Sequence, residues 1–376
     1  MKVHQSNDYL PTLDGWRAIA ILMVLVCHGF AMIQGPSGYF PNEFWRAITV
    51  KGSLGVQLFF GISGFLICSR LLDEETGGGR IGLKGFYVRR IFRILPPYAV
   101  NLIAIWLLAA SSLIAMTPRE WWASVFFVRN YVPIGLNEGW YTGHFWSLMV
   151  EEHFYLLAPG LLVLVPKTRR LGFFLGICAA ISLWRTFDFR TQWSSMFLGP
   201  GQTFTGRSDV TIDTLFWGAA GALAVREYRE FFVRLAHRAW LTPALISAVI
   251  LTETVRVPQG GFVQGFLIVS ILLSTLLHPQ TLVSRALEAG WLRWIGRLSY
   301  SLYIWNNLFL IPDHIRPVAP LSYLQYPPVN IICVFAVATL SYYFVEKPMI
   351  SLGRKLASRW RSKPLTSESV PNMRAS

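Results

Sequence analysis

Long apolar stretches are the feature that most restricts how this chain can fold. Stretches of about 18 or more apolar residues, each long enough to cross roughly 30 Å of hydrocarbon, recur along the 376-residue sequence. Only 14% of the residues are charged, whereas a soluble domain carries roughly 25%. The sequence therefore predicts an all-α integral membrane protein.

Ten segments are candidate transmembrane helices. They are residues 13–34, 53–72, 88–114, 147–166, 171–187, 211–226, 239–256, 261–278, 292–312 and 328–348. A further apolar stretch, "EWWASVFFVRNYV" at 120–132, is too short to span and contains an arginine, so it predicts a short interfacial or re-entrant helix. The first segment lacks the basic run and small-residue cleavage site of a signal peptide, and we expect a retained helix.

Lysine and arginine are distributed unequally between the two sets of loops. Twenty-three of them fall on one side and eight on the other, and the positive-inside rule places the larger group in the cytoplasm. An even number of spans puts both termini on that side. We therefore expect a multi-pass protein of the cell (inner) membrane, in which the net charge of +14 reflects topology rather than nucleic-acid binding.

The sequence shows no internal repeat and no long soluble insertion. It divides into a cytoplasmic N-terminal segment (1–12), one transmembrane domain (13–350) and a basic, partly disordered cytoplasmic tail (351–376). The four cysteines lie in apolar segments without a CxxC pair, so no disulfide or metal site is indicated. The loop "DEETGGGRIGLKG" lacks the P-loop pattern, and we expect no permanently bound cofactor.

Two residues that can carry charge, Arg17 and His28, bracket an apolar run in "RAIAILMVLVCH". On an α-helix, eleven residues bring the chain back to within roughly 20° of the same face, about 16 Å further along. Charged residues inside a bilayer are costly and usually face an interior cavity. The segment therefore predicts two polar side chains facing the bundle interior at different depths, although a neutral histidine bonded between helices would explain His28 equally well.

Acidic residues follow an apolar run in "GHFWSLMVEEHFYLLAP", residues 143–159. Glu151 and Glu152 are adjacent, so their side chains point about 100° apart and at most one can face His28 squarely. An alternative is a wet helix end with acids that reach water. The nearby aromatic residues, among them Trp146, would suit either stacking on a sugar or the ordinary aromatic belt of a membrane interface.

Basic residues cluster in "FYVRRIFRILPPY", residues 86–98, at the cytoplasmic start of the third candidate span. Arg89, Arg90 and Arg93 are spaced to share one side of a helix, and guanidinium forks suit bidentate binding of phosphate. The same arginines would also serve as topology determinants. In "FFGISGFL", residues 59–66, small residues would let helices approach closely, with Ser63 available for a hydrogen bond between them.

Six motifs occur in an order that resembles the acyltransferase-3 family of membrane O-acyltransferases. They are "LDGWRAIAILMVLVCH", "FFGISGFLI", "RRIFRILPPY", "WSLMVEEHFYLLAP", "RLSYSLYIWN" and "FVEKP". The resemblance covers about residues 10–350 and implies ten or so transmembrane helices. It also implies transfer of an acetyl or other short acyl group from acyl-CoA to a hydroxyl.

The resemblance implies roles for particular residues. His28 matches the essential histidine of the family and Arg17 its paired arginine, while Arg90 and Arg93 match the RxxR motif linked to the CoA donor. Glu151 or Glu152 matches the acid of the fourth-span motif. Two further matches lie near the end of the chain: Glu346 is the acid of the closing E-x-P, and Asn306 stands where the family commonly has a histidine.

From these features we expect an enzyme that acylates a carbohydrate of the exopolysaccharide, O-antigen or lipo-oligosaccharide type. A macrolide-like acceptor is an alternative, and a transporter or flippase of a polar lipid-linked substrate is an alternative of another class that would be expected to show two similar halves. His28 is expected to act as general base, with a carboxylate orienting its imidazole. An acyl-histidine relay remains open.

Overall fold

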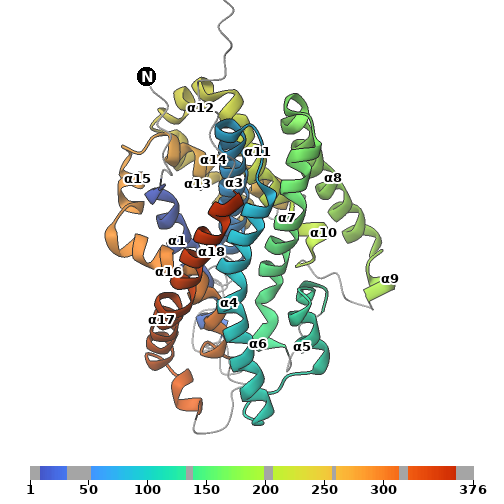
Figure 1. Ribbon diagram of the computed structural model, residues 1–376, viewed down its shortest axis with the longest axis vertical. Coiled ribbons are helices and arrows are strands. Elements are labelled where there is room, and N and C mark those ends of the chain that lie inside the picture. The colour runs from blue at the N-terminus through green and yellow to red at the C-terminus, as the bar shows by residue number, and fades with distance from the viewer. Residues whose placement is uncertain are drawn as a thin grey trace, which may run out of the picture.

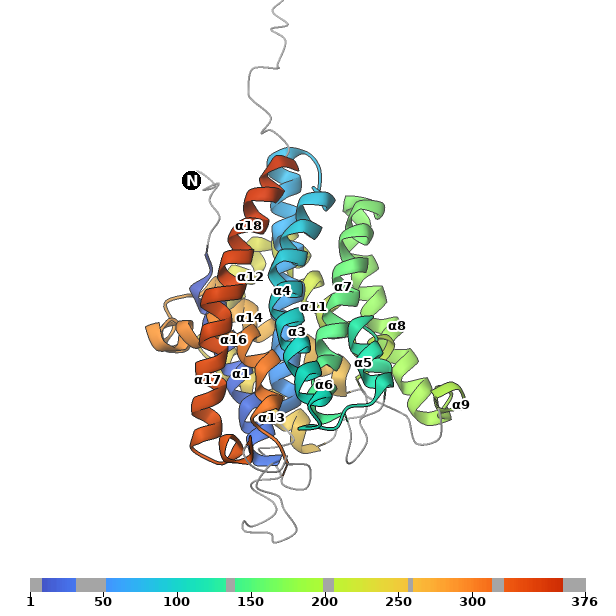
Figure 2. The same ribbon diagram turned by 60° about the horizontal axis from the view of Figure 1, so that its bottom comes forward.

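The computed structural model describes residues 9–31, 52–132, 139–198, 206–255, 260–312 and 321–360. Over these ranges the chain forms helices and no strands, which confirms the predicted all-α class for the described part. The long helices run side by side along the longest axis of the molecule (Figure 1). Figure 2 shows the end of α18 at one end of the bundle and α5, α6 and α9 toward the other.

The described helices differ widely in length. The long helices are α1 (Pro11–Ala31), α3 (Gly52–Gly78), α4 (Leu83–Ala110), α7 (Phe145–Leu164), α8 (Arg170–Thr191), α11 (Asp213–Glu227), α13 (Leu241–Val255), α14 (Gly260–Leu277), α16 (Gly290–Trp305), α17 (Val329–Ser341) and α18 (Lys347–Ala357). The short ones are α5 (Pro118–Val125), α6 (Trp140–Gly143), α9 (Ser195–Leu198), α10 (Ser208–Thr211), α12 (Arg229–Ala236) and α15 (Leu282–Leu287). Single turns of 3₁₀-helix include η1 (Arg129–Tyr131) and η3 (Asn306–Leu308), and η6 (Tyr342–Glu346) is a π-helix.

Six described helices are long and apolar enough to cross a membrane, and the pair α12–α13, bent by 86°, makes a possible seventh. The protein is therefore a multi-pass helical membrane protein, but the predicted count of ten spans is not confirmed. The difference arises because an apolar run need not be one helix. In the predicted span 292–312, α16 ends at Trp305 and the chain continues as the 3₁₀ turn η3.

The last described helical segment extends past residue 350, where we predicted that the membrane domain ends and a tail begins. Helical structure continues from α17 through η6 into α18, so that Val329–Ala357 is one helical segment of 29 residues. Pro348 lies inside this segment, two residues after the end of the π-helix η6. α18 packs along α4, where Gly353 faces Phe92 closely (Figure 2). The remainder of the predicted tail, from residue 361, lies outside the described residues.

Glycines set the closest helix contacts in the centre of the bundle. A Cβ atom on Gly64 of α3 would lie 2.0 Å from the carbonyl oxygen of Leu215 on α11, and one on Gly218 of α11 would lie 2.4 Å from the carbonyl oxygen of Gly61. The predicted role of the small residues in "FFGISGFL" is therefore confirmed. This close packing places α3 at the centre, with α1 and α11 against it.

The segment predicted as an interfacial or re-entrant helix forms α5 followed by η1. Its Arg129 is fully buried and lies 4.0 Å from the carboxylate of Glu120. Its guanidinium donates hydrogen bonds to the hydroxyl of Thr142 (3.0 Å) and to the carbonyl oxygens of Val132 (2.5 Å) and Gly139 (3.2 Å). Arg129 thus ties η1 to the chain that enters α6 and α7, and is not free to act as a topology determinant.

Candidate active site

A polar cavity of about 70 Å³ lies between α1, α3, α4, α7 and α16. Five charged side chains line it: Arg17, Arg70, Arg90, Arg93 and Glu151. Several hydroxyl groups complete the wall, namely those of Ser63, Ser147, Tyr155, Ser299, Tyr300 and Tyr303. Because four guanidinium groups face one carboxylate, the cavity carries an excess of positive charge and suits an anion with more than one negative charge.

Aromatic rings hold Arg90 in the cavity wall. Its guanidinium carbon lies 4.9 Å from the centroid of the Tyr155 ring and 5.6 Å from that of Phe86, within the range of cation–π attraction. The Tyr155 hydroxyl in turn donates a hydrogen bond to the carboxylate of Glu151. Arg90 and Glu151 are therefore linked through one tyrosine.

Arg17 belongs to the same arginine cluster. A carboxylate oxygen of Asp14, one turn earlier on α1, lies 3.7 Å from its guanidinium. His28 lies eleven residues further along α1, which is about 16 Å on an α-helix. The prediction that both residues face the bundle interior at different depths agrees with this placement, and the structure groups Arg17 with the other arginines rather than with His28.

Arg89 lies apart from the cavity, although it was predicted to bind the donor together with Arg90 and Arg93. Its guanidinium forms an ion pair with Glu74 near the end of α3, and it does not contribute to the described cavity wall. Neighbouring residues on a helix point about 100° apart, so Arg89 and Arg90 face different surroundings. Of the three arginines predicted to bind the donor, Arg90 and Arg93 line the cavity and Arg89 does not; donor binding itself stays a prediction.

Arg70 was missed at the sequence level and lies on the exposed side of the cavity, near the end of α3. Ion pairs hold the same end of α3 in place. Glu75 binds Arg170 at 2.6 Å, and Asp73 lies 3.1 Å from Arg226. Because these acids already have partners, the arginines that line the cavity remain available to an anionic ligand.

His28 lies near the other end of α1, away from the cavity wall. Its Nδ1 is 2.5 Å from Oδ1 of Asn306, a fully buried residue at the start of η3. The edge of its ring meets the Trp140 ring, with 5.6 Å between centroids and 62° between planes. Among the described residues, the side chain that contacts Nδ1 is a neutral amide and not the carboxylate that we expected to orient the imidazole.

Tyr303 connects the cavity to the surroundings of His28. It lines the cavity, and its hydroxyl donates to the carbonyl oxygen of His144 (2.5 Å) and lies 2.5 Å from the hydroxyl of Ser147. Its own carbonyl oxygen accepts a hydrogen bond from the amide nitrogen of Asn306. A single turn of chain at the end of α16 thus contacts both the arginine cavity and His28.

The remaining predicted residues fall into different environments. Of the two adjacent acids, Glu151 lines the cavity, whereas Glu152 has a buried oxygen, Oε1, with no hydrogen-bond partner in the structure. Ser63 lines the cavity as well. Trp146 packs edge-to-face on Phe60, with 6.3 Å between ring centroids. That contact favours a packing role for Trp146 over sugar stacking.

Glu346 is buried, with 2% of its surface exposed, and accepts a hydrogen bond of 2.8 Å from the hydroxyl of Ser301. It is the last residue of the π-helix η6, a distortion that is frequent at functional sites because it redirects side chains. Glu346 is not among the residues that line the arginine cavity.

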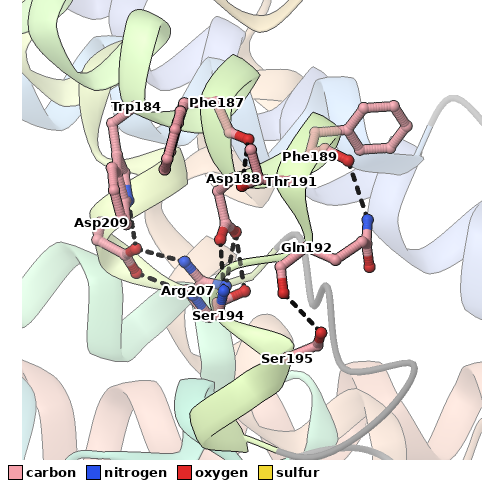
Figure 3. Close-up of polar contacts among 10 residues, drawn as sticks. All are labelled: Trp184, Phe187, Asp188, Phe189, Thr191, Gln192, Ser194, Ser195, Arg207 and Asp209. Carbon is pink, nitrogen blue, oxygen red and sulfur yellow. Dashed lines mark hydrogen bonds and ion pairs between the residues drawn. The ribbon is translucent and has the colours of Figure 1, made fainter.

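A second polar cluster joins the end of α8 to the chain before α10 (Figure 3). Arg207 is buried and binds Asp188 at 2.9 Å and Asp209 at 2.5 Å, and the indole of Trp184 donates to Asp209 at 2.8 Å. Burial alone would raise the pKa of Asp209, but the hydrogen bonds and charge of Arg207, together with Trp184, hold this pKa below its usual range. The cluster thus stabilises this part of the chain.

Among the described residues, no group of three or more His, Cys, Asp and Glu side chains is placed to hold a metal ion. The fold brings together the arginines, the hydroxyl groups and the Glu151 carboxylate that line the cavity. Nearby, the imidazole of His28 is held by the amide of Asn306. Such a set can bind an anion and exchange protons. It defines a class of multi-pass membrane enzymes or carriers that handle an anionic substrate.

Comparison with known proteins narrows this class. The acyltransferase domain family Acyl_transf_3 matches residues 10–346, and the chain belongs to this family of acyltransferases. The Staphylococcus aureus (strain MRSA252) protein named "Putative O-acetyltransferase SAR0937" is 28% identical over 389 residues, which cover 96% of this chain and 60% of that protein. Peptidoglycan O-acetyltransferase OatA of Listeria monocytogenes is 25% identical over 375 residues, covering 92% and 56% respectively. The chain thus spans about three fifths of the length of these relatives. No solved structure matches it.

Proposed function

We propose that this protein transfers an acetyl or other short acyl group from acyl-CoA to a hydroxyl of a cell-surface carbohydrate. The observation that carries the proposal is the cavity with four arginines, which is linked through Tyr303 and Asn306 to His28. The family supplies the reaction class, since its members are acyltransferases and the relatives are named O-acetyltransferases.

In this proposal the phosphate groups of acyl-CoA bind the arginine cavity. Arg90 and Arg93 come from α4, Arg17 from α1, and all three guanidinium groups face one space. Charge-assisted bonds to phosphate are stronger than neutral ones and are often bidentate with arginine. The thin pantetheine arm would extend from the cavity along α16 toward His28, and acyl-CoA is a substrate rather than a resident cofactor.

His28 then acts as general base on the acceptor hydroxyl. As the hydroxyl oxygen attacks the thioester carbon, the imidazole takes its proton, a C–O bond forms and the C–S bond breaks. The CoA thiolate leaves and recovers a proton from the imidazolium, so that CoA thiol and the acyl ester are the products. General base catalysis of this kind contributes typically 10²–10⁴-fold. An acyl-histidine relay, in which His28 itself carries the acyl group, is a second route to the same two products, CoA thiol and the acyl ester.

The acceptor is proposed to be a carbohydrate because a relative carries the name peptidoglycan O-acetyltransferase. The experiment is to incubate the purified protein with radiolabelled acetyl-CoA and to measure both CoA release and labelled product. Peptidoglycan fragments, O-antigen-type and exopolysaccharide oligosaccharides, and a macrolide are offered in parallel. Labelled oligosaccharide supports the proposal. Labelled macrolide alone would contradict the acceptor class, and acceptor translocation without CoA release would indicate a flippase.

The arginine cavity provides a test of donor binding. Arg90→Gln and Arg93→Gln should each raise the KM for acyl-CoA about 10- to 100-fold, because one charge-assisted hydrogen bond contributes roughly 1.5–3 kcal/mol; kcat should change little. Arg89→Gln is the matched control, since Arg89 pairs with Glu74 outside the cavity wall. Steady-state kinetics with varied acyl-CoA give both constants. If the KM for acyl-CoA in all three variants equalled that of wild type, Arg90 and Arg93 would not bind the donor and would serve only as topology determinants.

We also propose that α11, α13, α14 and α16 are spans, which gives ten in total, with both termini in the cytoplasm. The support is the charge distribution, with 23 basic residues on one side and eight on the other. In a background without the native cysteines, Thr191→Cys and Ser358→Cys place single thiols at exposed positions near the two ends of the bundle. An impermeant maleimide added to intact cells should label position 191 and not position 358. The reverse pattern would overturn the orientation.

A further inference from the structure

The end of α16 positions one amide group beside His28. The α-helix stops at Trp305, and the chain tightens into the 3₁₀ turn η3, whose first residue is Asn306. Asn306 is fully buried, so its amide must find partners within the protein. Two partners are present, the imidazole of His28 and the carbonyl oxygen of Tyr303.

These two partners determine which way the amide faces. The Tyr303 carbonyl oxygen can only accept a hydrogen bond, and it lies 2.5 Å from Nδ2 of Asn306, which therefore donates to it. Oδ1 of Asn306 consequently faces Nδ1 of His28, at 2.5 Å. An amide oxygen carries no proton, so Nδ1 of His28 must be the donor. In the neutral imidazole, Nε2 is then the nitrogen with a free lone pair.

We propose that Asn306 is a positioning residue that fixes His28 in the tautomer with the proton on Nδ1 and so presents Nε2 as the general base. This inference rests on the proposed role of His28 as the base. It assigns a function to Asn306, which stands where the family that the sequence resembles commonly has a histidine. A second histidine could present either a donor or an acceptor to His28, whereas the asparagine offers the oxygen only.

Neighbouring contacts keep this arrangement rigid. The Tyr303 hydroxyl donates to the carbonyl oxygen of His144 at 2.5 Å, which fixes the turn that carries the Tyr303 carbonyl. On the other side of His28, the Trp140 ring is held by a 3.0 Å bond from its indole nitrogen to the carbonyl oxygen of Leu310. Asn307 donates to the Trp140 carbonyl oxygen at 2.8 Å. The imidazole is therefore confined between a fixed amide and a fixed ring.

The Asn306 amide differs from a carboxylate in that it holds His28 without adding a charge. The amide oxygen selects the tautomer but adds no negative charge within the bilayer, where charged groups are costly. Asn306→Asp keeps an oxygen facing Nδ1 and adds a charge that stabilises the imidazolium, while it loses the hydrogen bond that Nδ2 donates to the Tyr303 carbonyl oxygen. Asn306→Leu is similar in size and removes both hydrogen bonds. The two variants therefore separate tautomer selection from simple packing.

The test measures acyl transfer against pH for wild type, Asn306→Asp and Asn306→Leu. We expect Asn306→Leu to lower kcat by on the order of 10²–10⁴, as loss of the correct tautomer does elsewhere, with the KM for acyl-CoA within about twofold of wild type. Asn306→Asp should retain most of the activity at high pH, and the acid limb of its pH–rate profile should move to higher pH by about one unit or more. A purely structural role for Asn306 would not move this limb.

A second readout is independent of activity. In protein labelled with ¹⁵N-histidine, the resonances of His28 are identified as those lost in His28→Ala, and wild type should show a protonated Nδ1 and an unprotonated Nε2. Asn306→Leu should show a mixture of both tautomers. An unprotonated Nδ1 in wild type would overturn the inference, as would an inactive His28→Ala variant combined with an unchanged pH profile in Asn306→Asp. An active His28→Ala variant would instead overturn the proposed base.

Discussion

His28→Ala is expected to reduce acyl transfer to the background rate, a loss of at least 10²-fold and on the order of 10⁴-fold if the imidazole supplies the full benefit of a general base. Membrane insertion should be unaffected, because His28 is half-buried at one end of α1 and its main partner is the side chain of Asn306. The measurement is the initial rate of label transfer from acetyl-CoA by purified protein.

His237→Ala is the matched control for this variant, because His237 is an exposed residue just after α12 and distant in sequence from every cavity residue. It should transfer acyl groups at the wild-type rate. If His28→Ala retained activity within severalfold of this control, His28 would have a structural role only. The proposed mechanism would then lose its base, although the arginine cavity would remain a candidate donor site.

Gly64→Ala is expected to prevent correct folding, or to destabilise the protein by about 3 kcal/mol or more. A Cβ atom at this position would lie 2.0 Å from the Leu215 carbonyl oxygen, and overpacking a tight contact costs typically 1–3 kcal/mol and occasionally more. This loss of stability would occur although alanine is intrinsically favoured over glycine in a helix by roughly 1 kcal/mol. Thermal unfolding and the yield of monodisperse protein measure the effect.

Gly77→Ala provides the comparison within the same helix. No atom lies within 4 Å of a Cβ built on Gly77, so this variant should be as stable as wild type or slightly more stable. Similar melting temperatures for the two variants would show that α3 and α11 can separate without cost. The role assigned to the small residues between them would then be wrong.

Helical periodicity was enough to predict some of the site. The spacing of Arg17 and His28 placed both on one face of a helix, and α1 carries them in this way. The same rule says that adjacent residues diverge, which explains why Glu151 reaches the cavity and Glu152 does not, and why Arg90 separates from Arg89. These differences follow from a rotation of about 100° per residue, but which of two neighbours faces inward depends on the packing of other helices.

Contacts between distant segments were beyond prediction from the sequence. Asn306 and His28 are 278 residues apart, and their contact depends on the point at which α16 becomes a 3₁₀ turn. The two asparagines at 306 and 307 interrupt the apolar run at that point, but they do not indicate which distant residue they contact. The apolar pattern likewise did not mark where the last helical segment ends, because the chain continues as a helix from α17 through η6 into α18. α18 packs along α4.

The arginine cavity contacts, in the proposed function, a part of the donor that the reaction leaves unchanged. The phosphates of acyl-CoA and of free CoA are identical, so Arg17, Arg70, Arg90 and Arg93 offer no means of distinguishing the reactant from the spent carrier. Both would compete for the same arginines, so that free CoA would occupy the cavity in proportion to its concentration and inhibit binding of the donor. The ratio of the two in the cytosol would then govern throughput, which couples surface modification to the metabolic state of the cell.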